Sequence, residues 1–83
     1  MKTCFVGSSE CLDQTIRYSL LSASTEDGAE QYGVLVEYRD EQTAIPDITT
    51  SREDAENLLS LLVQGSVTPV SVQDVVDDWL QRD

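Results

Sequence analysis

Residues 31–39 read Gln-Tyr-Gly-Val-Leu-Val-Glu-Tyr-Arg, and this stretch decides the fold of the chain. One of its two alternating sets is β-branched or aromatic throughout: Tyr32, Val34, Val36 and Tyr38. Because successive strand residues point to opposite faces, this alternation predicts a half-buried strand. Gly33 interrupts the other set. A glycine inside a strand indicates either a bulge where a neighbouring segment packs closely or a place where a ligand approaches.

The segments on either side predict further strands. Residues 15–22 also alternate, with Ile16, Tyr18 and Leu20 on one face. The Asp-Gly pair at residues 27–28 predicts a turn, so the two stretches are expected to form an antiparallel hairpin with a loop longer than two residues. Residues 43–48 predict a third strand, which its proline would confine to an edge or end early.

The N-terminal segment is harder to interpret. Both alternating sets of residues 1–7 contain apolar side chains, so the period is unclear, and residues 8–10 (Ser-Ser-Glu) predict a turn. We therefore expect residues 1–12 to be either a short strand or a loose arm.

The first helix is expected to begin near Thr50 or Ser51, where the spacing to Glu53 and Asp54 resembles a capping box. Gly65 is expected to end it in a left-handed conformation. Between these limits, one apolar stripe follows helical spacing: Ala55, Leu58, Leu59, Leu62 and Val63.

The second helix is expected to begin at Ser71, which can cap it, with Val70 packing on Val75 as a hydrophobic staple. Its apolar stripe is Val72, Val75, Val76, Trp79 and Leu80. The prediction is one α+β domain over residues 1–83: an antiparallel sheet of about three strands followed by two α-helices packed on one face. A third strand or a dimeric sheet is expected, since two strands alone would be marginal.

Charge limits the classes of partner. Sixteen acidic and five basic residues give the chain a formal net charge of -11. Nucleic acids and anionic membranes are disfavoured, because binding to their phosphates depends on Lys and Arg. Residues 40–83 hold ten acidic and two basic residues, so the acidity concentrates in the C-terminal half. Neither a membrane-spanning stretch nor a signal peptide is evident, so a cytoplasmic location is expected.

The chain has no histidine, which removes the commonest general base and metal ligand. We expect neither an enzyme nor a cofactor or metal site. Two cysteines, Cys4 and Cys11, are too few for a structural zinc site. In a reducing cytosol they are expected to be free thiols, although their number alone allows a disulfide.

The second helix carries the candidate interaction surface: Asp74, Asp77, Asp78 and Trp79. Asp74 and Asp78 share a helix face four residues apart, which brings like charges together. The three acids form either a solvated face, a docking surface for a basic partner, or a weak cation site. Trp79 lies on the apolar stripe, so it belongs either to the core or to an interface.

Residues 67–80 (Val-Thr-Pro-Val-Ser-Val-Gln-Asp-Val-Val-Asp-Asp-Trp-Leu) resemble the C-terminal signature of a family of short bacterial proteins of unknown function. Other matching marks are residues 16–18, 32–34 and 47–49, so the resemblance runs from about Thr15 to the end of that signature. It implies a shared fold and a bacterial cytosolic origin, and no activity.

The function expected from these features is a non-enzymatic protein–protein interaction or regulatory module with a partner of basic surface. Two alternatives stay open: a small-molecule or cation sensor using the cleft between sheet and helices, and an acidic mimic of nucleic acid. A homodimer is also among the expected assemblies.

Overall fold

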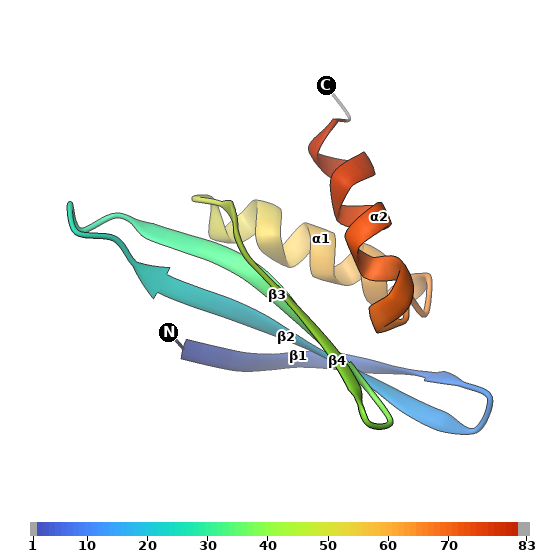
Figure 1. Ribbon diagram of the computed structural model, residues 1–83. Helices are drawn as coiled ribbons and strands as arrows, with labels where there is room; N and C mark the ends of the chain where they lie inside the picture. The colour runs from blue at the N-terminus through green and yellow to red at the C-terminus, as the bar shows by residue number, and fades with distance from the viewer. Residues whose placement is uncertain (1, 82–83) are drawn as a thin grey trace.

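The computed structural model describes residues 2–81, in which four strands precede two helices (Figure 1). The elements are β1 (Lys2–Cys11), β2 (Gln14–Ser24), β3 (Glu30–Tyr38), β4 (Glu41–Thr49), α1 (Arg52–Gln64) and α2 (Pro69–Leu80). The strands form one antiparallel sheet in the order β1-β2-β3-β4. The α+β prediction is confirmed, with four strands in place of three.

The additional strand is β1, which pairs with β2 over its whole length. Its pairing shifts between Phe5 and Gly7, so that Val6 is an extra, bulged residue. A bulge moves all later side chains to the other face, which explains why the sequence of this strand shows no clear period of two. The turn predicted at residues 8–10 is wrong: it lies at Leu12 and Asp13, whose φ angles are 52° and 67°. Met1 lies outside the described residues.

Gly33 marks a close approach of two strands. The pairing of β3 with β4 shifts between Tyr32 and Val34, and a Cβ at Gly33 would fall on the carbonyl group of Ile45 and 2.6 Å from the Cα of Pro46. Of the two explanations for this glycine, the structure therefore supports a bulge with close backbone packing. Pro46 lies in an edge strand, as predicted.

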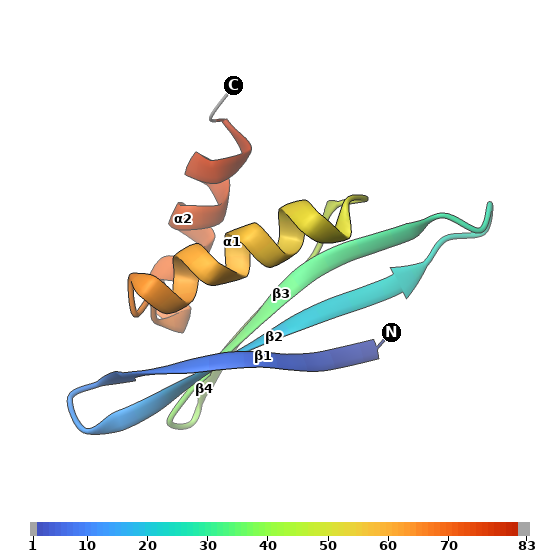
Figure 2. The same ribbon diagram turned by 180° about the vertical axis from the view of Figure 1, so that it is seen from behind.

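The core lies between one face of the sheet and the two helices (Figures 1 and 2). The predicted faces of β2 and β3 and the predicted helix stripes supply it. Its buried members are Ile16, Tyr18, Leu20, Val34, Val36, Ala55, Leu58, Leu59, Leu62, Val72, Val76 and Trp79. Leu80, predicted to face inward, is instead 52% exposed, because it flanks the stripe in the last turn.

The start of α1 follows the prediction and its end does not. The hydroxyl of Ser51 accepts a hydrogen bond from the backbone N–H of Asp54 at 3.3 Å, so Ser51 is the N-cap. Gly65 has φ -89° and is not left-handed; Ser66, with φ 48°, holds that conformation. The N–H of Ser66 bonds the carbonyl of Val63, and the N–H of Val67 bonds that of Leu62. This is a Schellman motif with serine in the position that glycine usually occupies.

The start of α2 differs from the prediction. The helix begins at Pro69 with Thr68 as N-cap, so Ser71 is its third residue and caps nothing. Proline suits the first helical position, because its fixed φ fits the helix and the N–H it lacks would have no partner there. Val70 is 76% exposed and forms no staple with Val75.

Candidate functional site

The outward side of α2 presents the acidic face, which we define as Asp74, Asp77 and Asp78. All three side chains are exposed, whereas Val72, Val76 and Trp79 on the opposite side of the helix are buried. Figures 1 and 2 show α2 rising away from the sheet toward the C-terminus, while α1 lies along the sheet. The predicted acids are therefore brought together on a helix face that no other element covers.

The charges of this face are not neutralised within the described part of the chain. There the single ion pair joins Arg52 and Glu56 of α1, at 3.9 Å. The amide of Gln73 donates a 3.0 Å hydrogen bond to the Asp77 carboxylate. This bond orients the carboxylate and leaves its charge in place.

Two basic side chains on the strands and turns, Arg17 and Arg39, contact aromatic rings. The guanidinium of Arg17 lies 4.6 Å from the ring centroid of Phe5, and that of Arg39 lies 5.1 Å from the ring of Tyr38. Both are cation–π distances. These arginines stabilise aromatic rings of the sheet and leave α2 acidic.

Trp79 does not belong to the exposed surface. It is 9% exposed and lies in the core cluster with Val72 and Val76 of the same helix. Its burial supports the core assignment, which the sequence left open beside an interface assignment. Helical spacing is consistent with this position, because Trp79 follows Val72 by seven residues and Val76 by three.

Among residues 2–81, no group of three or more Cys, Asp or Glu side chains is arranged to hold a metal ion. Asp74, Asp77 and Asp78 follow the surface of one helix and do not converge on a point. Cys4 and Cys11 are free thiols on the same strand, and seven residues of strand separate them by roughly 20 Å. A disulfide requires Cα atoms within about 7 Å, so these two cysteines cannot pair within one chain.

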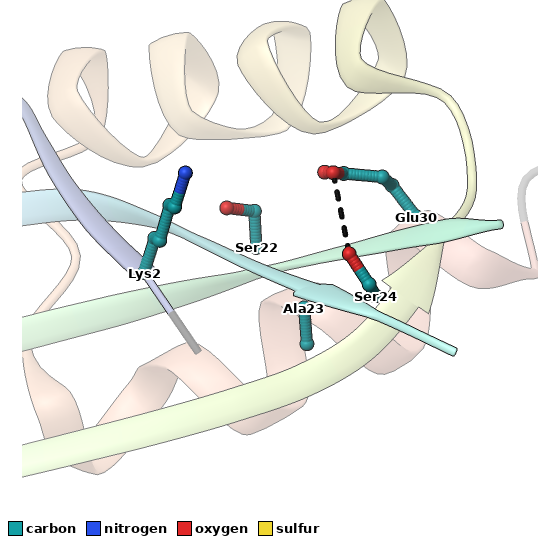
Figure 3. Close-up of a pocket in the computed structure, with 5 residues that line it drawn as sticks. All are labelled: Lys2, Ser22, Ala23, Ser24 and Glu30. Carbon is teal, nitrogen blue, oxygen red and sulfur yellow. Dashed lines mark hydrogen bonds between the residues drawn. The ribbon is translucent and has the colours of Figure 1, made fainter. Parts of the chain in front are cut away.

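A shallow hollow of about 300 Å³ lies at the ends of three strands, where Lys2, Ser22, Ala23, Ser24 and Glu30 line it (Figure 3). Lys2, Ser22 and Glu30 point to the side of the sheet that α1 covers, and Ala23 points the opposite way. The Ser24 hydroxyl donates a 3.5 Å hydrogen bond to Glu30. Because every lining residue is exposed or half-buried, the hollow offers no desolvated group to hold a small molecule.

A family model describing a family of unknown function (DUF6514) matches residues 2–82. The chain belongs to this family. The match includes β1, which the resemblance noted from the sequence did not reach. No curated protein and no solved structure matches the chain. The DUF6514 family carries no assigned activity, so it gives no residue of this chain a role.

Neither helix described in this DUF6514 protein is long and apolar enough to span a membrane.

Proposed function

We propose that this DUF6514 protein is a non-enzymatic, cytoplasmic protein-binding module of bacterial origin, and that the acidic face of α2 docks on a basic surface of its partner. The observation that carries the proposal is the exposed row of Asp74, Asp77 and Asp78 on a helix anchored from behind by Trp79. A fixed helix presents its charges at constant spacing, which gives a charged partner a defined orientation as well as attraction.

The local energetics of the helix support this proposal. Asp77 and Asp78 lie in the C-terminal half of α2, where the helix dipole disfavours negative charge, and its last turn contains no basic residue. Local conflicts of this kind, in which residues reduce the stability of their own helix, are expected at functional or strained sites.

The test compares two double variants of equal charge change. Asp77→Asn with Asp78→Asn alters the acidic face, and Asp40→Asn with Glu41→Gln alters the exposed turn between β3 and β4. Each protein is immobilised and used to capture partners from native lysate of the source bacterium. Quantitative mass spectrometry should show a partner lost with the α2 variant and kept with the turn variant. Equal recovery by both variants would remove the acidic face as the docking site.

The site that the acidic face occupies on the captured partner distinguishes ordinary docking from nucleic-acid mimicry. If the partner is a nucleic-acid-binding protein, adding DNA or RNA oligonucleotide should release it from the immobilised chain only where the acids occupy its nucleic-acid site. Retention of the partner at saturating oligonucleotide would exclude mimicry and leave ordinary docking.

A further inference from the structure

Strand β1 is an edge strand with an unusually exposed surface. Within residues 2–81 it pairs only with β2, and none of its ten residues is buried. Phe5 is 51% exposed and Val6 is 43% exposed. The outer edge of such a strand carries unpaired N–H and C=O groups, which form a ready template for another strand.

The opposite edge of the sheet is protected against such pairing. Strand β4 contains Pro46, which has no N–H to donate, and Asp47, whose φ of 58° breaks the extended conformation. Its pairing with β3 is also bulged at the same place. Proline, bulges and charge are the usual means by which an edge is blunted. On β1 the bulge at Val6 and the terminal Lys2 are the corresponding features, and most of the edge stays regular.

The distribution of charge along the chain also distinguishes the two edges of the sheet. Residues 2–24 contain two acidic and two basic residues and have no net charge, whereas residues 25–81 contain thirteen acidic and two basic residues. Two copies of this acidic protein therefore repel each other least when they meet along the hairpin of β1 and β2. In that arrangement β4 and the acidic face of α2 lie far from the contact.

We propose that β1 pairs antiparallel with β1 of a second copy, so that the two sheets form one continuous sheet. The charges of β1 select the direction. Parallel pairing in register would place Lys2 beside the partner's Lys2 and Glu10 beside the partner's Glu10, whereas antiparallel pairing sets the two Lys2 residues, and likewise the two Glu10 residues, at opposite ends of the strand pair. Like charges opposite each other destabilise a strand pair.

The bulge at Val6 fixes the register. Three residues of β1 lie on the helix side of the sheet, because they pair with the core-facing residues Leu20, Tyr18 and Ile16 of β2: Cys4, Gly7 and Ser9. The outer side of the strand carries Phe5 and Ser8. One antiparallel register uses all ten residues of β1 and places residues of the same side of the sheet opposite each other. In this register Lys2 pairs with the partner's Cys11, Thr3 with the partner's Glu10, Cys4 with the partner's Ser9 and Phe5 with the partner's Ser8. Its two-fold axis passes between Val6 and Gly7.

The residues near this axis suit a contact between copies. Gly7 has no side chain, which leaves room for the partner's bulge at Val6. A Cβ at Gly7 would lie 3.6 Å from a methyl group of Val63, so Val63 of α1 covers this point on the helix side. The axis therefore brings the half-buried Val63 and the partner's Val63 together, and adds apolar contact to the backbone hydrogen bonds.

The first test measures mass in solution. Sedimentation equilibrium of the wild-type chain, whose monomer has a mass of 9.2 kDa, should show a concentration-dependent dimer. Val6→Lys places two positive charges across the axis and should weaken dimerisation by about two- to fivefold. Gln42→Lys adds the same charge to exposed β4 and should not weaken it. A wild-type monomer at all concentrations, or equal weakening by both variants, would overturn the proposal.

The second test locates the register. Ser9→Cys with Cys11→Ser leaves natural Cys4 directly opposite the new cysteine of the partner, so mild oxidation should give a disulfide-linked dimer. Ser8→Cys with Cys11→Ser puts the new thiol on the other side of the sheet and should link poorly. Equal linkage would contradict the register. Asp77→Asn with Asp78→Asn should leave the dimer unchanged, so this proposal and partner docking fail independently.

Discussion

The hydroxyl of Tyr18 donates a 2.7 Å hydrogen bond to the backbone carbonyl of Val67 and so ties the centre of the sheet to the connection between the helices. Two further bonds flank it: the Ser9 and Ser66 hydroxyls lie 2.6 Å apart, and the Thr43 hydroxyl donates to the carbonyl of Pro69 at 3.0 Å. Together they fix the point from which α2 leaves the sheet, and hence the direction of its acidic face.

Tyr18→Phe should lower the free energy of unfolding by about 1 kcal/mol. The change removes one hydrogen bond and leaves the Val67 carbonyl half-buried without this donor, while the ring keeps its packing. Urea denaturation followed by the fluorescence of Trp79 measures the loss. Tyr32→Phe, which removes the hydroxyl of a half-buried tyrosine on β3, is the matched control and should change stability by less than about 0.5 kcal/mol. An unchanged midpoint for Tyr18→Phe would show that the bond contributes nothing.

Alkaline pH should weaken the fold through the same tyrosine. Burial, and then the neighbouring Cys11, raise the pKa of Tyr18 from its ordinary 10.0 to about 12. The folded chain therefore keeps this proton after the unfolded chain has begun to lose it. The stabilisation is complete below about pH 10 and is lost as pH rises toward about 12. The stability difference between wild type and Tyr18→Phe should shrink over this range, and a constant difference would contradict the raised pKa.

Gly33→Ala should destabilise the protein severely, by about 2–4 kcal/mol, because the new Cβ would overlap the backbone of Ile45 and Pro46. Backbone cannot move aside as a flexible side chain can, so β4 must shift. Thermal unfolding measures the effect. If a ligand rather than β4 were the reason for this glycine, the variant would fold with wild-type stability.

Gly65→Ala should be neutral or stabilising by about 0.5 kcal/mol. Its φ of -89° suits any residue, the nearest atoms to a new Cβ lie 3.4 Å away, and alanine restricts the unfolded chain more than glycine. The left-handed residue is Ser66. A loss above about 1 kcal/mol in thermal or urea unfolding, as expected for alanine in a left-handed conformation, would place that conformation at Gly65 instead.

The two N-caps should respond differently to alanine. Ser51→Ala removes a bond to the N–H of Asp54 and should cost about 1 kcal/mol. Thr68→Ala should cost less, because the Thr68 side chain makes no capping hydrogen bond. Thr68→Asp should stabilise α2 by about 0.5–1 kcal/mol, since its first turn contains no acid to complement the helix dipole. Chemical denaturation ranks the three variants, and equal losses at both caps would refute the difference.

Prediction from the sequence succeeds where one period runs unbroken through an element. The alternation of Ile16, Tyr18 and Leu20 and the helical spacing of Leu58 and Leu62 assign these residues to the core correctly. It fails for β1, because the bulge at Val6 exchanges the faces within the strand. Prediction also fails at the start of α2. A proline can either precede a helix or occupy its first position, and the sequence alone does not distinguish the two.

The candidate site could be predicted in part for the same reason. Helical spacing places Asp74, Asp77 and Asp78 opposite Val72 and Val76, and the structure exposes all three acids. The hydrogen bonds that orient α2 could not be predicted, since they join residues far apart in the chain: Tyr18 and Val67 are separated by 49 positions. The free edge of β1 could not be recognised until the strand itself was known.

Asp77→Asn with Asp78→Asn should make the isolated protein more stable, by about 0.5–1 kcal/mol, while it abolishes capture of the partner. The gain follows from removing negative charge near the C-terminal end of α2 and from relieving the repulsion between Asp74 and Asp78. The amide oxygen that replaces the Asp77 carboxylate can still accept the hydrogen bond from Gln73, so the orientation of the side chain is kept. Denaturant midpoints measured beside the capture experiment check both effects.

If the acids served only solubility, stability would rise and binding would stay intact. If they were structural, stability would fall. Opposite changes in stability and binding are expected only for a surface that acts on another molecule.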